Sequence, residues 1–90
     1  MYFILDNLIN EHCFCINHKV FDYQLDKDTK LVYIYIIFCA GKEHETNINE
    51  IAKKCSMKPT TVHYSIQKLL AEKLLLKKEE NNYHIQEFKL

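Results

Sequence analysis

The sequence predicts a small α+β protein in which three helices precede a C-terminal β-hairpin. Three observations carry this prediction. Residues 48–73 repeat apolar side chains at helical spacing around a tight turn, residues 26–41 form a longer capped apolar segment, and residues 74–88 resolve into two short strands around a polar turn. A chain of 90 residues has the size of one domain, so we expect residues 1–90 to fold as a single unit.

Residues 26–41 are the first predicted helix. Asp26 is placed to cap it, and Gly41 is placed to close it in the left-handed conformation. The intervening run from Leu31 to Phe38 is rich in residues that also favour strands, but the caps and the length indicate a helix that is buried on most sides. Glu45 to Asn47 is then expected to be a short strand before the next helix.

Residues 48–73 are predicted to be two helices joined by a tight turn. Asn47 is a suitable N-cap for the first, and Glu50 is placed to complete a capping box. The second helix opens at Pro59, whose fixed φ suits a first helical turn. Its buried face is expected to comprise Val62, Ile66, Leu69 and Leu70.

The pattern Ile51-Ala52-x-x-Cys55-Ser56-Met57-x-x-x-Thr61-Val62 resembles the helix-turn-helix of winged-helix DNA-binding domains. Together with the predicted hairpin it implies a winged helix-turn-helix, with a three-helix core at 26–73 and a wing at 74–90. In that family the second helix of the pair lies in the major groove. The resemblance implies that this recognition helix contacts DNA through Lys58, Thr60, Thr61, His63, Tyr64, Gln67 and Lys68.

The wing is predicted to turn at Asn81-Asn82, because asparagine tolerates the positive φ of a tight hairpin. The chain contains no arginine, so guanidinium readout of guanine is excluded, and Gln67 is the best side chain for an adenine edge. We therefore expect the wing to carry as much of the interface as the helix. Its candidate DNA-binding residues are Lys77, Lys78, Asn81, Asn82, Tyr83 and His84.

Charge is unevenly distributed along a chain whose formal net charge is zero. Residues 51–78 carry seven lysines and one glutamate, a balance of +6, whereas residues 1–50 carry −4 and residues 79–90 carry −2. A basic stretch over the helix-turn-helix and the following strand suits phosphate contact. A lysine-rich face that is merely solvated is the alternative.

The N-terminal extension at 1–18 is predicted to hold a strand at Tyr2–Leu5 and a second strand at 12–16. The two strands either pair as a hairpin, or the second joins the sheet of the wing. We expect Tyr2–Leu5 to be covered, either by a second subunit or by the same chain. The nearby cluster of His12, Cys13, Cys15 and His18 offers four zinc-type donors, but its Cys-x-Cys spacing favours thiols packed in a strand, and we predict no metal. Cys39 and Cys55 are expected to be core residues without disulfides.

Composition points to the source and the compartment. Lysine (12), isoleucine (10) and asparagine (7) abound, whereas glycine and proline occur once each, which indicates an AT-rich bacterial genome, plasmid or phage. The longest apolar run has ten residues, about half of the ~20 that a membrane helix needs. No signal-peptide pattern opens the chain, so we expect a cytoplasmic protein that does not enter the membrane.

No catalytic constellation is recognisable, and a chain with a single glycine has no glycine-rich phosphate loop, so we predict neither an enzyme nor a cofactor. The segment from Val20 to Tyr35 resembles the opening of the winged helices of plasmid replication initiators and of replisome and plasmid-conjugation accessory proteins. This implies an accessory protein that binds AT-rich double-stranded DNA at origin repeats in replication or conjugative transfer. A homodimer is expected, and other replication or relaxosome proteins are further candidate partners. The alternatives are a small transcriptional regulator and a self-assembly module that does not bind DNA.

Overall fold

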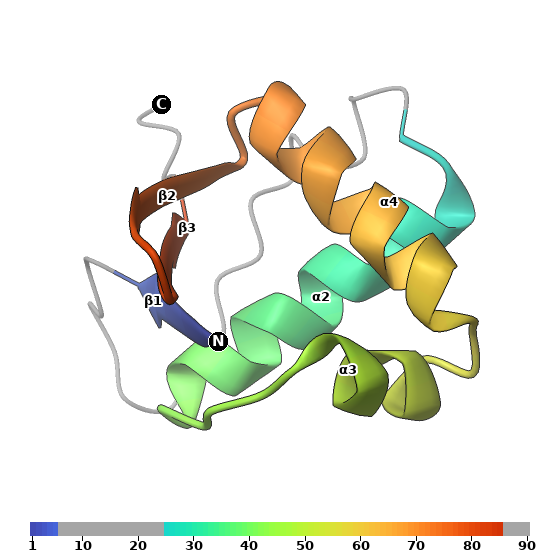
Figure 1. Ribbon diagram of the computed structural model, residues 1–90, viewed down its shortest axis with the longest axis horizontal. Helices are drawn as coiled ribbons and strands as arrows, with labels where there is room; N and C mark the ends of the chain where they lie inside the picture. Colours follow the sequence, from blue (N-terminus) through green and yellow to red (C-terminus); the bar gives the residue numbers. More distant parts are fainter. Residues whose placement is uncertain (6–24, 86–90) are drawn as a thin grey trace.

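The computed structural model describes residues 1–5 and 25–85. These residues form a small α+β fold, as predicted, with the sheet on one side of the helices (Figure 1). The elements are β1 (Tyr2–Leu5), α2 (Lys27–Gly41), α3 (Ile48–Lys54), α4 (Pro59–Ala71), β2 (Leu75–Glu79) and β3 (Asn82–Ile85). The strand predicted at 12–16, the histidine and cysteine cluster at 12–18 and the end of the last predicted strand lie outside the described residues.

The sheet has the order β1-β3-β2, with β3 in the centre. Strands β2 and β3 form the expected antiparallel hairpin, whereas β1 runs parallel to β3 with Phe3 opposite Tyr83. A parallel pair cannot be a hairpin, because its two strands need a long connection, which here includes all three described helices. The N-terminal strand is therefore confirmed, and its partner is the last described strand of the chain.

The prediction of a short strand at 45–47 is wrong, because these residues form no strand. Thr46 instead exchanges two hydrogen bonds with Met1: its N–H donates to the Met1 carbonyl (3.0 Å), and its carbonyl accepts from the Met1 amine (2.9 Å). Strand β1 occupies the place beside β3. The physical reason is burial, because β1 brings Phe3 into the core at 3% exposure, whereas the stretch 45–47 contributes only Thr46.

The core lies between the sheet and the three described helices. Helices α2 and α4 pack against each other, α3 packs on α4, and β1 packs on α2. The predicted inner face of α4 is confirmed, since Val62, Ile66 and Leu69 are buried and Leu70 is half-buried. Cys39 and Cys55 are both buried free thiols, as expected, and burial raises the pKa of each.

All three described helices end in the same way, with a non-glycine residue in the left-handed conformation. These residues are Glu43 (φ 53°), Ser56 (φ 53°) and Lys73 (φ 61°). In each case the residue's N–H and the next N–H bond back into the last helical turn, as in a Schellman motif. The prediction that Gly41 takes this conformation is wrong, because α2 continues through Gly41 and the left-handed residue comes two positions later.

The hairpin turn also differs from the prediction. Neither Asn81 nor Asn82 has a positive φ. The register between β2 and β3 shifts between Lys77 and Glu79, so that Glu79 pairs with Asn82 and Lys78 is an extra residue on β2. The bulge lets the chain reverse at residues 80–81 without the left-handed backbone that a two-residue primed turn requires.

Candidate nucleic-acid interface

Helix α3 is positioned by its N-terminal cap. The side-chain oxygen of Asn47 accepts a hydrogen bond from the Glu50 N–H (2.8 Å), as predicted. The Glu50 carboxylate accepts instead from the Thr46 hydroxyl (3.1 Å) and lies 2.9 Å from Nε2 of His44. These two contacts, the His44 contact first, lower the pKa of Glu50. The cap thus ties the start of α3 to Thr46, whose backbone also bonds Met1.

The turn between α3 and α4 depends on Ser56. Its N–H donates to the Lys53 carbonyl, and the Met57 N–H donates to the Ala52 carbonyl at 2.9 Å. Met57 is half-buried and packs against the core, in the corner between the helices. Pro59 then occupies the first turn of α4, as expected, and none of the described side chains caps that helix end. The positive end of the α4 dipole is therefore available to an anion.

One face of α4 is exposed and mostly polar. Residues 60, 63, 64, 67 and 71 are exposed and recur at three- and four-residue spacing, so they form one stripe along the helix. Tyr64 is the most exposed large hydrophobic side chain in the described part of the chain, with 60% of its surface exposed. The predicted recognition residues that lie on or next to this stripe and are exposed are Lys58, Thr60, His63, Tyr64 and Gln67.

Two predicted recognition residues are placed differently. Thr61 is half-buried beside the apolar face of α4. Lys68 is also half-buried, and its Nζ lies 4.0 Å from Oδ1 of Asp26 at the start of α2. A phosphate contact through Lys68 has to compete with this ion pair. The five exposed candidates, Lys58, Thr60, His63, Tyr64 and Gln67, are therefore the better ones.

The hairpin presents both signs of charge. Lys77 and Lys78 are exposed on β2, and Nζ of Lys77 lies 5.7 Å from the centroid of the Tyr83 ring on β3. The tip carries the exposed carboxylates of Glu79 and Glu80, and Glu79 accepts a hydrogen bond from the Asn82 amide at 2.8 Å. Asn82, Tyr83 and His84 are half-buried. Phosphates are attracted to the β2 lysines and repelled by the tip.

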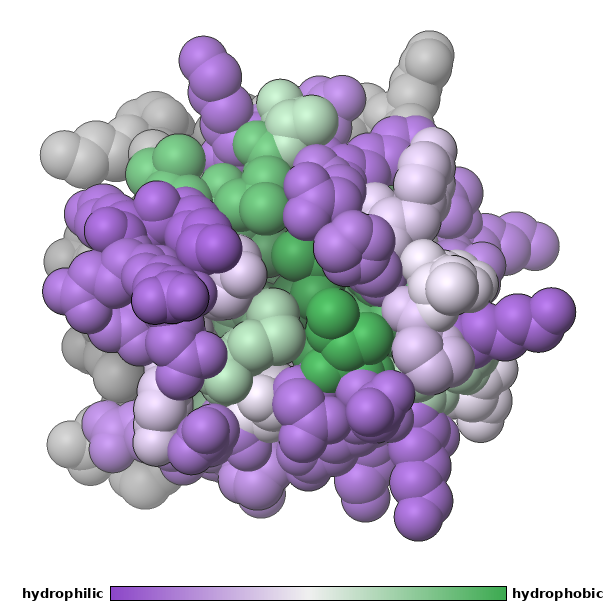
Figure 2. Space-filling model, viewed as in Figure 1, coloured by the Kyte–Doolittle hydropathy of each residue, from purple (hydrophilic) through white to green (hydrophobic). Residues whose placement is uncertain are grey.

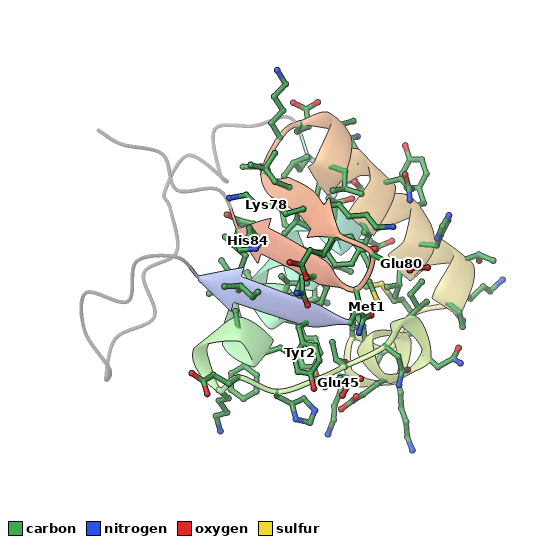
Figure 3. All side chains as sticks on the ribbon, turned by 60° about the vertical axis from the view of Figure 1, so that its left-hand side comes forward. Met1, Tyr2, Glu45, Lys78, Glu80 and His84 are labelled. Carbon is green, nitrogen blue, oxygen red and sulfur yellow. The ribbon has the colours of Figure 1, made fainter. Side chains whose placement is uncertain are left out.

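The hairpin is held against the N-terminal strand up to its tip. The Tyr2 N–H donates to the Asn81 carbonyl (2.9 Å), and the Tyr2 hydroxyl donates to the Glu45 carboxylate (2.9 Å). The second bond, more than any other influence, raises the pKa of Tyr2. Figure 3 shows Met1 at the Glu80 end of the sheet, and the Tyr2 ring directed toward Glu45. The hairpin thus forms the centre (β3) and one edge (β2) of a three-stranded sheet and is not a free arm.

Two lysines complete the basic surface. Lys53 and Lys54 are exposed in the last turn of α3, directly before the turn that leads into α4. They are not among the DNA-binding residues predicted from the sequence, although they belong to the +6 stretch at 51–78. With Lys58 they bring three positive charges to the region where α3 ends and α4 begins. Phosphates that flank an inserted helix are contacted from such positions.

The face in Figure 2 is hydrophilic over the sheet side and over the α4 side, with a band of hydrophobic atoms between the two.

No group of three histidine, cysteine or carboxylate residues that could hold a metal ion occurs within residues 1–5 and 25–85. Nor is any helix in the described part of the chain long and apolar enough to cross a membrane.

The chain was compared with models of protein families, with curated proteins and with solved structures, and none of them matches it.

Proposed function

We propose that the protein is a winged helix-turn-helix that binds double-stranded DNA with α4 as its recognition helix. The observation that carries the proposal is the exposed, mostly polar stripe of α4, with Lys53, Lys54 and Lys58 exposed just before that helix in the chain. Its hydroxyl, imidazole and amide groups can hydrogen-bond to base edges, and lysines can contact the phosphates on either side. The order of α3, turn, α4 and hairpin agrees with such a domain.

Lys77 and Lys78 are the second proposed contact. They lie on β2, which follows α4 directly, whereas Glu79 and Glu80 occupy the hairpin tip. Because carboxylates repel phosphates, we propose that β2 rather than the tip meets the DNA backbone. In this interface α4 contacts the bases. The lysines of α3, the α3–α4 turn and β2 contact phosphates and so fix the position of the duplex.

The proposed biological role is that of a plasmid or phage accessory protein that binds repeats in AT-rich DNA during replication or conjugative transfer. The resemblance of residues 20–35 and 51–62 to such winged helices supports this role. A small transcriptional regulator would use the same face. A second candidate function is self-assembly without DNA, which is favoured by the exposed apolar residues of α2, Leu31, Ile34 and Phe38.

The experiment that tests DNA binding is the affinity for a random AT-rich duplex measured by fluorescence anisotropy as a function of salt. Each phosphate neutralised by a lysine contributes roughly 0.9 to the slope of log affinity against log salt. We expect Lys53→Ala/Lys54→Ala and Lys77→Ala/Lys78→Ala each to flatten this slope. The matched control, Lys27→Ala/Lys30→Ala, removes the same two charges from α2 and should leave the slope unchanged.

Circular dichroism of every variant separates loss of contact from loss of fold. If the folded wild-type protein does not bind at low salt, the DNA-binding proposal is wrong and self-assembly becomes the function to pursue. If the α2 control flattens the slope as much as the other pairs do, binding is a non-specific charge effect and α4 is not its centre.

A further inference from the structure

Helix α2 has an apolar stripe on the side that faces away from the core. Leu31, Ile34 and Phe38 are 44%, 36% and 42% exposed, and they follow one another at spacings of three and four residues. Tyr35, on the same side, is half-buried. The helix is buried on most of its sides, as predicted, and this stripe is the side that stays exposed. A row of large apolar side chains at this spacing is the pattern by which one helix packs on another.

Two aromatic rings lie against each other in this stripe and at its edge. The rings of Tyr35 and Phe38 are stacked with their centroids 6.1 Å apart, and Nζ of Lys42 lies 4.8 Å from the centroid of Phe38. A tyrosine hydroxyl is neutral at physiological pH, and burial, more than any other influence, raises the pKa of Tyr35 further, to about 12. The ring can therefore enter an apolar contact without bringing in a charge.

Charges along the edge of the stripe indicate which partner packs on it. Asp28, Tyr35 and Lys42 are seven residues apart and so lie on one edge of the stripe. Asp28 and Lys42, at the two ends of the helix, carry opposite charges, and Asp28 has no ion-pair partner among the described residues. An edge that is negative at one end and positive at the other is complementary to itself when it is reversed.

We propose that two copies of this chain pair through antiparallel α2 helices. Leu31 of each copy then packs on Phe38 of the other, Ile34 lies at the centre, and Asp28 of each faces Lys42 of the other. A parallel pair would bring like charges together at both ends of the stripe. Antiparallel pairing also places opposite ends of the helix dipoles side by side.

The pairing does not depend on DNA, but together with the proposed function it specifies the arrangement of the DNA site. A twofold axis through the α2 pair relates the two α4 helices. Half-sites read by helices related in this way are inverted with respect to each other, so the proposed dimer reads inverted rather than direct repeats. This consequence rests on the proposed function, whereas the pairing itself is tested without DNA.

The test is sedimentation equilibrium of the whole chain over a wide range of protein concentration. The wild-type protein should approach twice the chain mass of 10.8 kDa. Ile34→Glu should remain monomeric, because it buries an unpaired carboxylate at the centre of the pair. The matched control is Tyr64→Glu, which places a carboxylate at the exposed position of another large side chain, on α4, and should leave the dimer intact.

A charge exchange tests the antiparallel arrangement. Asp28→Lys and Lys42→Asp should each weaken the dimer about tenfold, since each disrupts two symmetry-related ion pairs, and the double variant should restore it. A wild-type monomer at all concentrations, or a dimer that survives Ile34→Glu, would overturn the proposal. Failure of the double variant to restore the dimer would overturn the antiparallel arrangement. Should Ile34→Glu unfold, Phe38→Ser is the substitute, because Phe38 is even more exposed.

Discussion

Thr29 on α2 and Ser65 on α4 are both fully buried, and their hydroxyl oxygens lie within hydrogen-bond distance at 3.3 Å. Thr29 also donates to the Asp26 carboxylate, which is the largest cause of the lowered pKa of Asp26. Since Thr29 has one proton and the carboxylate can only accept, Ser65 must be the donor toward Thr29. The chain of three polar groups fixes how α4 sits on α2, and so fixes which side of α4 faces outward.

Replacing these two residues should therefore have unequal effects on the free energy of unfolding. Ser65→Ala removes one neutral hydrogen bond and should destabilise the protein by about 1 kcal/mol. Thr29→Val leaves the buried Ser65 hydroxyl unpaired and takes a donor from Asp26, so a loss of roughly 1–3 kcal/mol is expected. Urea denaturation followed by circular dichroism measures both values. Equal losses would contradict the assigned direction of the hydrogen bonds.

Glycine at the left-handed helix ends should stabilise the protein. Glu43, Ser56 and Lys73 have positive φ values that side chains with a Cβ adopt at a penalty, whereas glycine does not. Each of Glu43→Gly, Ser56→Gly and Lys73→Gly should raise the free energy of unfolding by about 0.5–1 kcal/mol. Ser56→Ala is the control, because it removes the hydroxyl but keeps the Cβ. Stabilisation by Ser56→Ala to the same extent would indicate that the backbone conformation is not the cause.

The contact between Glu50 and His44 makes stability depend on pH at the acid end. The pKa of Glu50 is lowered from its ordinary value of 4.5, so the folded state favours the ionised carboxylate. This contribution is fully present above pH 4.5 and is lost as the pH falls through the lower folded value. Glu50→Gln should flatten the acid limb of a thermal-denaturation profile against pH.

Glu72→Gln is the matched substitution for the pH profile. Glu72 is exposed at the end of α4 and makes no side-chain hydrogen bond within the described part of the chain. Its profile should follow that of the wild-type protein. An unchanged acid limb in Glu50→Gln would mean that the contacts to His44 and Thr46 do not persist in solution.

Neutralising the hairpin tip should strengthen DNA binding if β2 lies along the duplex. Glu79→Gln/Glu80→Gln removes two carboxylates next to Lys77 and Lys78, and we expect the affinity at low salt to rise a few-fold. Glu43→Gln/Glu72→Gln removes the same charge at other exposed positions and should have a smaller effect. A fall in affinity for the tip variant would indicate that Glu79 and Glu80 contact bases directly.

Substitutions on α4 should separate base reading from phosphate contact. Tyr64→Ala and Gln67→Ala remove no charge, so the dependence of affinity on salt should keep its slope while the affinity itself falls about tenfold. Binding curves at several salt concentrations give both quantities. A variant that binds as tightly as the wild-type protein would exclude that side chain from the interface.

The local pattern of the sequence determined the helices, their order and the polar face of α4. Asn47 and Pro59 mark helix starts by properties of their own backbone and side chains, and the spacing of Val62, Ile66 and Leu69 specifies an inner face without reference to the rest of the chain. The same local rules placed the hairpin and its lysines. The spacing of Leu31, Ile34 and Phe38 also puts them on one side of a helix, but spacing alone does not show whether that side is buried or exposed.

Only the tertiary structure decided the contacts between distant segments. The pairing of β1 with β3, the two hydrogen bonds between Met1 and Thr46, and the Thr29–Ser65 contact join residues that are 36 to 80 positions apart. Backbone groups are chemically alike at every residue, so the sequence cannot say which edge a strand will find. Burial of Phe3 selects the β3 edge, and that choice sets the hairpin against the N-terminal strand and gives the proposed DNA-binding face its shape.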